Sequence, residues 1–156
     1  MKTLFTIAGI GLALAGAASA ADKDYVFKDK GSFTATGNIT VTAAAVSLPC
    51  TAVLQGTTHG HPQITSAQFS GLTCLALTGS NFPWRMHAIG PHTFSINDVT
   101  VSAVTLGVCG PGKIRAQLNA AGIINISGDS LPGLVPCAVS GNLKSQPGLN
   151  IDRKRN

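Results

Sequence analysis

Four cysteines divide this chain into two segments of similar design. Cys50 opens the first segment and Cys74 closes it, while Cys109 and Cys137 bracket the second. Each segment contains a run of alternating apolar and polar residues, a turn, and a second alternating run. We interpret the segments as similar β-rich halves and favour one disulfide within each half. Other pairings of four cysteines are possible, and the spacing does not choose among them.

The alternation is clearest from Ser32 to Thr42, where apolar or small residues such as Phe33, Ile39 and Val41 alternate with Ser, Thr and Asn. A period of two residues is typical of a strand with one buried face. No stretch after residue 20 keeps a helical period. The sequence therefore predicts an all-β fold, an antiparallel sandwich or barrel of about eight or nine short strands.

Three stretches interrupt the alternation. Residues 77–92 contain several glycines and prolines, and we interpret them as a long connection between the halves. At Asn97-Asp98 the apolar residues change phase, which predicts a bulge or tight turn. The run Cys109-Gly110-Pro111-Gly112 has the composition of a turn.

The first residues have the pattern of a secretory signal peptide. A positive start is followed by an apolar run from Leu4 to Gly16 and by the small residues Ala18-Ser19-Ala20. The apolar run is shorter than the roughly 20 residues of a membrane-spanning helix. We predict cleavage after Ala20 and four parts: a signal peptide 1–20, a polar segment 21–31, a single β domain 32–151 and a basic tail 152–156.

Export agrees with the cysteine content, because cysteines of small exported proteins are normally oxidised in pairs. We expect an extracellular or cell-surface protein, with the periplasm as a further possibility and no transmembrane span in the mature chain. The formal net charge is +5, but the tail concentrates much of it in Arg153, Lys154 and Arg155. A nucleic-acid binder normally places its cations on the folded surface, so we do not expect nucleic-acid binding.

Residues for catalysis are scarce. The chain has no glutamate and its aspartates are scattered, which argues against a paired-carboxylate site. Ser130 lies in a run that superficially matches a nucleophile elbow, but Pro132 stands where the second glycine of that motif belongs. We therefore predict no catalytic residue, no cofactor and no enzymatic activity.

Two small groups of side chains are candidates for binding. His59 and His61 could present imidazoles to a metal together with His87 or His92, but we favour a polar turn whose histidines face water and predict no metal site. Phe82 and Trp84 form the second group. The only tryptophan either covers the core or offers its ring to an apolar ligand or surface.

Several motifs together resemble the protein activator of alkane oxidation family, of the PraA/PraB type. The resemblance covers nearly all of the chain after residue 20 and includes a similar signal peptide and all four cysteines. The residues that carry it are Ser47-Leu48-Pro49-Cys50, the run from Ile64 to Gly71 with Cys74, Pro83-Trp84, Cys109-Gly110-Pro111-Gly112 and the run from Cys137 to Gly141.

The resemblance implies an exported bacterial protein that promotes oxidation of long-chain n-alkanes without being the oxygenase. We expect such a protein to adsorb at the oil–water interface or to deliver alkane to the cell, so its expected partner is a long-chain hydrocarbon. The alternative is a self-associating cell-surface, fibre or biofilm-matrix subunit. The charge-poor body supports that alternative, because it leaves strand edges weakly protected against self-association.

Overall fold

The computed structural model describes residues 24–155, which form eleven β-strands and no helix. The predicted signal peptide lies outside the described residues. Within the described part of the chain, no helix is long and apolar enough to cross a membrane. The strands are β1 (Tyr25–Phe27), β2 (Ser32–Ala43), β3 (Val46–Thr57), β4 (Gln63–Ser70), β5 (Thr78–Ser80), β6 (Trp84–Ala88), β7 (Thr93–Ala103), β8 (Gly107–Leu118), β9 (Ile123–Leu131), β10 (Cys137–Gln146) and β11 (Ile151–Arg153).

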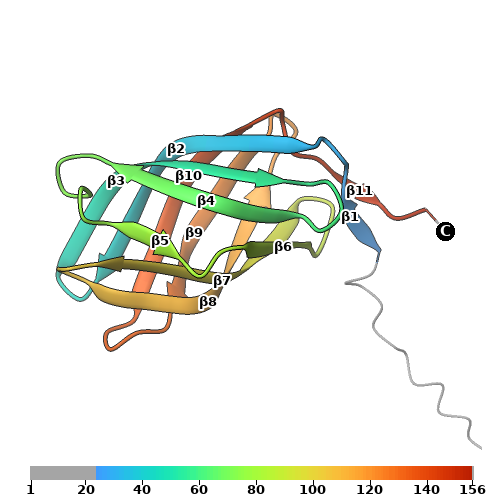
Figure 1. Cartoon of the computed structure of the whole chain (residues 1–156). Coiled ribbons are helices and arrows are strands. Elements are labelled where there is room, and N and C mark those ends of the chain that lie inside the picture. Colours follow the sequence, from blue (N-terminus) through green and yellow to red (C-terminus); the bar gives the residue numbers. More distant parts are fainter. Residues whose placement is uncertain (1–23, 156) are drawn as a thin grey trace, which may run out of the picture.

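Eight of the strands close into an antiparallel barrel (Figure 1). Around the ring the order is β7, β6, β4, β3, β2, β10, β9 and β8, and the pairing of β7 with β8 completes the circle. The short strand β5 pairs with β7 beyond the end of β6. This confirms the predicted all-β antiparallel fold. It also unites the two expected halves in a single barrel.

The alternation in the sequence fills the interior of the barrel. In β2 and β3 the buried side chains lie opposite each other, with Ile39 beside Cys50 and Val41 beside Leu48. The wall facing solvent carries the Ser, Thr and Asn residues between them. The interior of an eight-stranded barrel is just wide enough for side chains to fill it. The strands therefore supply one continuous hydrophobic core.

The strands β7 and β8 contain the irregularities of the ladder. The predicted phase slip is confirmed, because the register shifts between Ile96 and Val99 and Asp98 has a φ of 64°. The turn expected at Cys109-Gly110-Pro111-Gly112 is wrong, since these residues lie inside β8. A Cβ on Gly110 would lie 2.1 Å from the carbonyl oxygen of Val99, so glycine is needed for close contact between the strands and not for a turn.

Residues 77–92 are also not a plain connection, because they contain β5 and β6. Trp84, Met86 and Ala88 alternate inward along β6 and complete the wall of the barrel. The strands have only three and five residues and are separated by a turn with Pro83. Such short runs are hard to recognise among glycines and prolines, which explains the wrong expectation.

The two ends of the described chain meet beside one end of the barrel. There β1 and β11 form a separate two-stranded antiparallel sheet (Figure 1). Phe27 of β1 is buried and packs edge-on against Phe94, with 5.2 Å between ring centroids. Residues from both the predicted polar segment and the predicted basic tail therefore take part in the folded structure.

Two disulfides join strands at the other end of the barrel, and they confirm the favoured pairing. Cys50 is bonded to Cys74 and Cys109 to Cys137. All four residues are buried. The first bond ties β3 to the loop after β4, and the second ties β8 to the start of β10.

Removing one disulfide should destabilise the barrel without abolishing its topology. Replacing both Cys109 and Cys137 with alanine frees a loop with a sequence separation of 28 residues. We expect the free energy of unfolding to fall by roughly 3 kcal/mol, measured by denaturant titration. Replacing both Cys50 and Cys74 with alanine opens a loop with a sequence separation of 24 residues and should cause a similar loss. An unchanged midpoint in both variants would contradict a stabilising role.

Candidate functional site: an apolar end of the barrel

The strand directions bring four loops to the end of the barrel that holds both disulfides. They connect β2 to β3, β4 to β5, β7 to β8 and β9 to β10. The register fixes this arrangement, because Ala43 pairs with both Val46 and Cys137, and Cys137 pairs with Leu131. Figure 1 shows the four loops at the end away from β1 and β11.

Three of these loops and the start of β8 expose large apolar side chains, while the loop between β2 and β3 contains only Ala44 and Ala45. Leu72, Val104 and Leu134 are almost fully exposed, at 98%, 92% and 106% of their reference surfaces. Large apolar side chains exposed together at one end of a folded protein commonly mark an interaction site. We call this surface the apolar tip, and its large side chains are Leu72, Leu75, Val104, Val108, Leu134 and Val135.

The apolar tip is also free of formal charge. Residues 31–84, 99–112 and 130–143, from which all four loops come, contain no Asp, Glu, Lys or Arg. The opposite end carries the charged residues of β1, β11 and their flanks, including Lys28, Asp29, Arg153 and Lys154. The barrel is therefore amphiphilic along its length, with one apolar end and one charged end.

Local contacts hold the loops of the tip in place. In the loop between β4 and β5, the N–H of Cys74 donates to the carbonyl oxygen of Gly71 and the N–H of Leu77 donates to that of Cys74, both at 3.1 Å. Leu77 points into the core while Leu72 and Leu75 remain outside. Across the tip, the N–H of Gly110 donates to the carbonyl oxygen of Pro132 at 2.7 Å. The exposed leucines therefore project from anchored loops.

Trp84, one of the two aromatic candidates, is buried with 3% exposure. Its indole Nε1 donates to the carbonyl oxygen of Ser80 at 2.7 Å, and its ring stacks on Phe82 with centroids 4.7 Å apart. Phe82 is half-buried and packs against the core. Of the two alternatives for the tryptophan, the structure has the one in which it covers the core.

A small apolar cavity remains inside the barrel beside Trp84. Its volume is about 30 Å³, comparable to the space of one water molecule in the liquid. Its lining contains no polar residue and includes Phe69, Ile96, Ile114 and Leu143. A cavity of this character excludes charged and hydrogen-bonding ligands, because their polar groups would lose water without finding partners.

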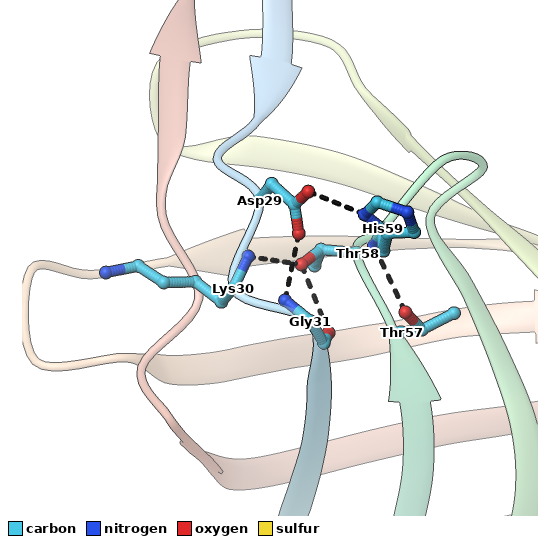
Figure 2. A network of polar contacts seen from close by, with 6 residues as sticks. All are labelled: Asp29, Lys30, Gly31, Thr57, Thr58 and His59. Carbon is cyan, nitrogen blue, oxygen red and sulfur yellow. Dashed lines mark hydrogen bonds and ion pairs between the residues drawn. The ribbon is translucent and has the colours of Figure 1, made fainter.

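The histidine candidates lie at the charged end, away from the apolar tip. His59 Nδ1 lies 2.8 Å from Asp29 Oδ2, while Thr58 Oγ1 accepts a hydrogen bond from the N–H of Lys30 (Figure 2). The contacts fasten the chain before β2 to the loop after β3. His61 is exposed, and residues 24–155 contain no group of three or more metal-ligating side chains.

The apolar tip was not predicted from the sequence. A usable signal was present, since Leu72, Leu75 and Leu134 lie in loops next to cysteines and outside any alternating strand. That these loops share one end follows only from the pairing of the strands.

Residues 1–153 of the chain match the family described as alkane oxidation protein activator PraA/PraB-like. Neither a curated protein nor a solved structure matches the chain.

The contact between Asp29 and His59 should depend on the ionisation of Asp29. The hydrogen bond with His59, followed by that from the Gly31 N–H, lowers the pKa of Asp29 below its ordinary value of 3.8. A lowered pKa stabilises the folded contact above the ordinary value, and this contribution is lost as the pH falls through the folded value. We expect the Gly31 amide resonance in an NMR titration to follow this loss.

Asp29→Asn should abolish the titration of the Gly31 amide, whereas Asp152→Asn, at another exposed aspartate of the same end, should preserve it. A Gly31 amide that titrates identically in the wild type and in Asp29→Asn would show that another group controls it.

Proposed function

Because the chain belongs to the alkane oxidation protein activator PraA/PraB-like family, we propose that it is an exported, non-enzymatic accessory protein that adsorbs to hydrocarbon through its apolar tip. Adsorption would promote n-alkane use by bringing the protein to the surface of the oil phase. The observation that carries the proposal is the collection of exposed, charge-free apolar side chains at one end of the barrel.

The hydrophobic effect supplies the driving force for this adsorption. Complete burial of one Val or Leu side chain gains about 1.5–3 kcal/mol. Six such side chains at the tip give a favourable contribution on the order of 10 kcal/mol before the cost of immobilising the molecule. A hydrocarbon surface needs no shape complementarity, so side chains from three separate loops suffice for binding.

The rest of the molecule supports a defined orientation at the interface. The charged end, with Lys28, Arg153 and Lys154, keeps its hydration only when it faces water. The wall of the barrel exposes Ser, Thr and Asn side chains. In this proposal the contact with oil is made by the tip, while Trp84 stays in the core.

The disulfides support export, because such bonds persist in oxidising compartments. The predicted signal peptide also supports export. The family description as an activator supports an accessory role beside a separate oxidising enzyme.

Self-association is the second candidate function, and the same tip favours it. Two molecules that meet tip to tip would cover their apolar ends, which corresponds to the structural-subunit alternative. An oil-binding protein, by contrast, stays monomeric at low concentration and keeps its tip exposed. Sedimentation velocity over a range of concentrations separates the alternatives, because a structural subunit assembles without any hydrocarbon.

Loss of the protein should impair growth on alkane specifically. We expect a strain lacking the gene to grow more slowly on hexadecane and normally on glucose, with rescue by purified mature protein added to the medium. Equal growth on both carbon sources would contradict the alkane function and place the structural-subunit alternative first.

Charges introduced at the apolar tip should prevent adsorption without unfolding the barrel. We would combine Leu72→Asp and Leu134→Asp in one double variant. Each substitution replaces a solvent-exposed leucine, so each should lower the free energy of unfolding by no more than about 0.5 kcal/mol. We expect each to weaken binding to hexadecane droplets by about tenfold or more. Co-sedimentation with an emulsion measures this binding.

The matched control is Gln117→Asp, which adds an exposed carboxylate near the charged end of the barrel. This control should bind droplets as the wild type does. Equal binding by the double leucine variant would rule out the tip as the adsorbing surface.

A further inference from the structure

The backbone pairing around the barrel is sparsest beside β4, which faces first β6 and then the short strand β5. Two residue pairs join β4 to β6, namely Gln63 with Arg85 and Ile64 with Trp84. Beyond them β4 continues to Ser70 next to β5, but within the described chain no ladder pairs these two strands. Figure 1 shows β5 beside β4 at this position. We call the contact between residues 65–70 and β5 the seam.

Apolar side chains close the seam instead of backbone hydrogen bonds. Ala67 and Phe69 of β4 are half-buried against the core, and so is Phe82 after β5. A Cβ added to Gly79 of β5 would lie 3.3 Å from the Ala67 Cβ and 2.9 Å from Phe82 Cζ. Opening the seam would therefore separate side chains without breaking a β ladder.

The seam connects the apolar tip to the cavity. At its outer end, Leu72 and Leu75 lie in the loop that joins β4 directly to β5. At its inner side, Phe69 and Trp84 line the cavity. Apolar side chains thus lie at both ends of the path that the seam would offer from the exposed leucines to the interior of the barrel.

The chemistry of this path selects the kind of ligand. The whole lining of the cavity is hydrophobic, and the Trp84 N–H already has a partner in Ser80. A fatty acid or an alcohol would bury its polar group there without a hydrogen bond, which costs free energy. An unbranched hydrocarbon has no polar group and is narrow enough to follow a gap between two strands.

We propose that a linear hydrocarbon chain enters the barrel from the tip through the seam. The resting cavity of about 30 Å³ is too small for such a chain, so Phe69 and Phe82 must move aside as the chain enters. Burial of its methylene groups against the core offsets the loss of these contacts. The inference rests on the proposed contact of the tip with hydrocarbon and extends it to a binding site inside the barrel.

Trp84 provides the test, because it is the only tryptophan and lines the cavity. A bromoalkane quenches tryptophan emission when its bromine comes into contact with the ring. We would titrate the mature protein with 1-bromooctane below its solubility limit, without an emulsion. Entry into the barrel predicts saturable quenching, and excess octane should reverse it by competition.

A disulfide across the seam makes the test specific. The distance of 3.3 Å from Ala67 Cβ to a Cβ on residue 79 is close to the roughly 3.8 Å between the Cβ atoms of a disulfide. The variant Ala67→Cys with Gly79→Cys should therefore form the bond, to be verified by mass spectrometry. Its matched control, Ala67→Ser with Gly79→Ser, carries the same new Cβ but no bond.

We expect the cross-linked variant to bind 1-bromooctane at least about tenfold more weakly than the serine control, while both adsorb equally to hexadecane droplets. Equal quenching of the two variants, or no quenching of the wild type, would overturn the entry route. Loss of droplet adsorption with quenching preserved would instead contradict the proposed function, so the two failures are distinguishable.

Discussion

The structure depends on the pairing of β7 with β8, which closes one antiparallel sheet edge to edge into a barrel. Closure gives each long strand two neighbours and divides its side chains between an interior and a wall. It also places the connections between successive long strands at one of two ends. The separation of apolar and charged ends is therefore a consequence of topology as well as of composition.

Local sequence pattern was enough to predict the fold class, and it favoured the observed disulfide pairing without excluding the others. The alternation around Ile39 and Val41 indicated strands with one buried face, and the position of each cysteine beside a hairpin indicated its partner. The same reasoning failed for β5 and β6, because a strand of three residues cannot show a period and the five-residue strand after it directly follows Pro83. Gly110 was misread as part of a turn, because its real constraint is the Val99 carbonyl of a neighbouring strand.

The candidate site was less accessible from sequence than the fold. Trp84 and His59 were chosen as candidates because of their residue type. Trp84 lies in the core, however, and His59 belongs to the charged end. Leu72 and Leu134 are ordinary residues about sixty positions apart in the sequence. Only the strand order brings their loops to one end, and exposure at that end is a property of the assembled barrel.

The location of both disulfides at the apolar end has a consequence for a protein that works against oil. Hydrocarbon is a good solvent for a hydrophobic core, so a protein film at an oil surface tends to spread and turn inside out. The bond from Cys50 to Cys74 ties β3 to the loop after β4, and the bond from Cys109 to Cys137 ties β8 to the start of β10, just behind the exposed leucines. In the proposed function, these bonds would oppose spreading at the place where it would begin, and the core would stay closed while the tip touches the oil.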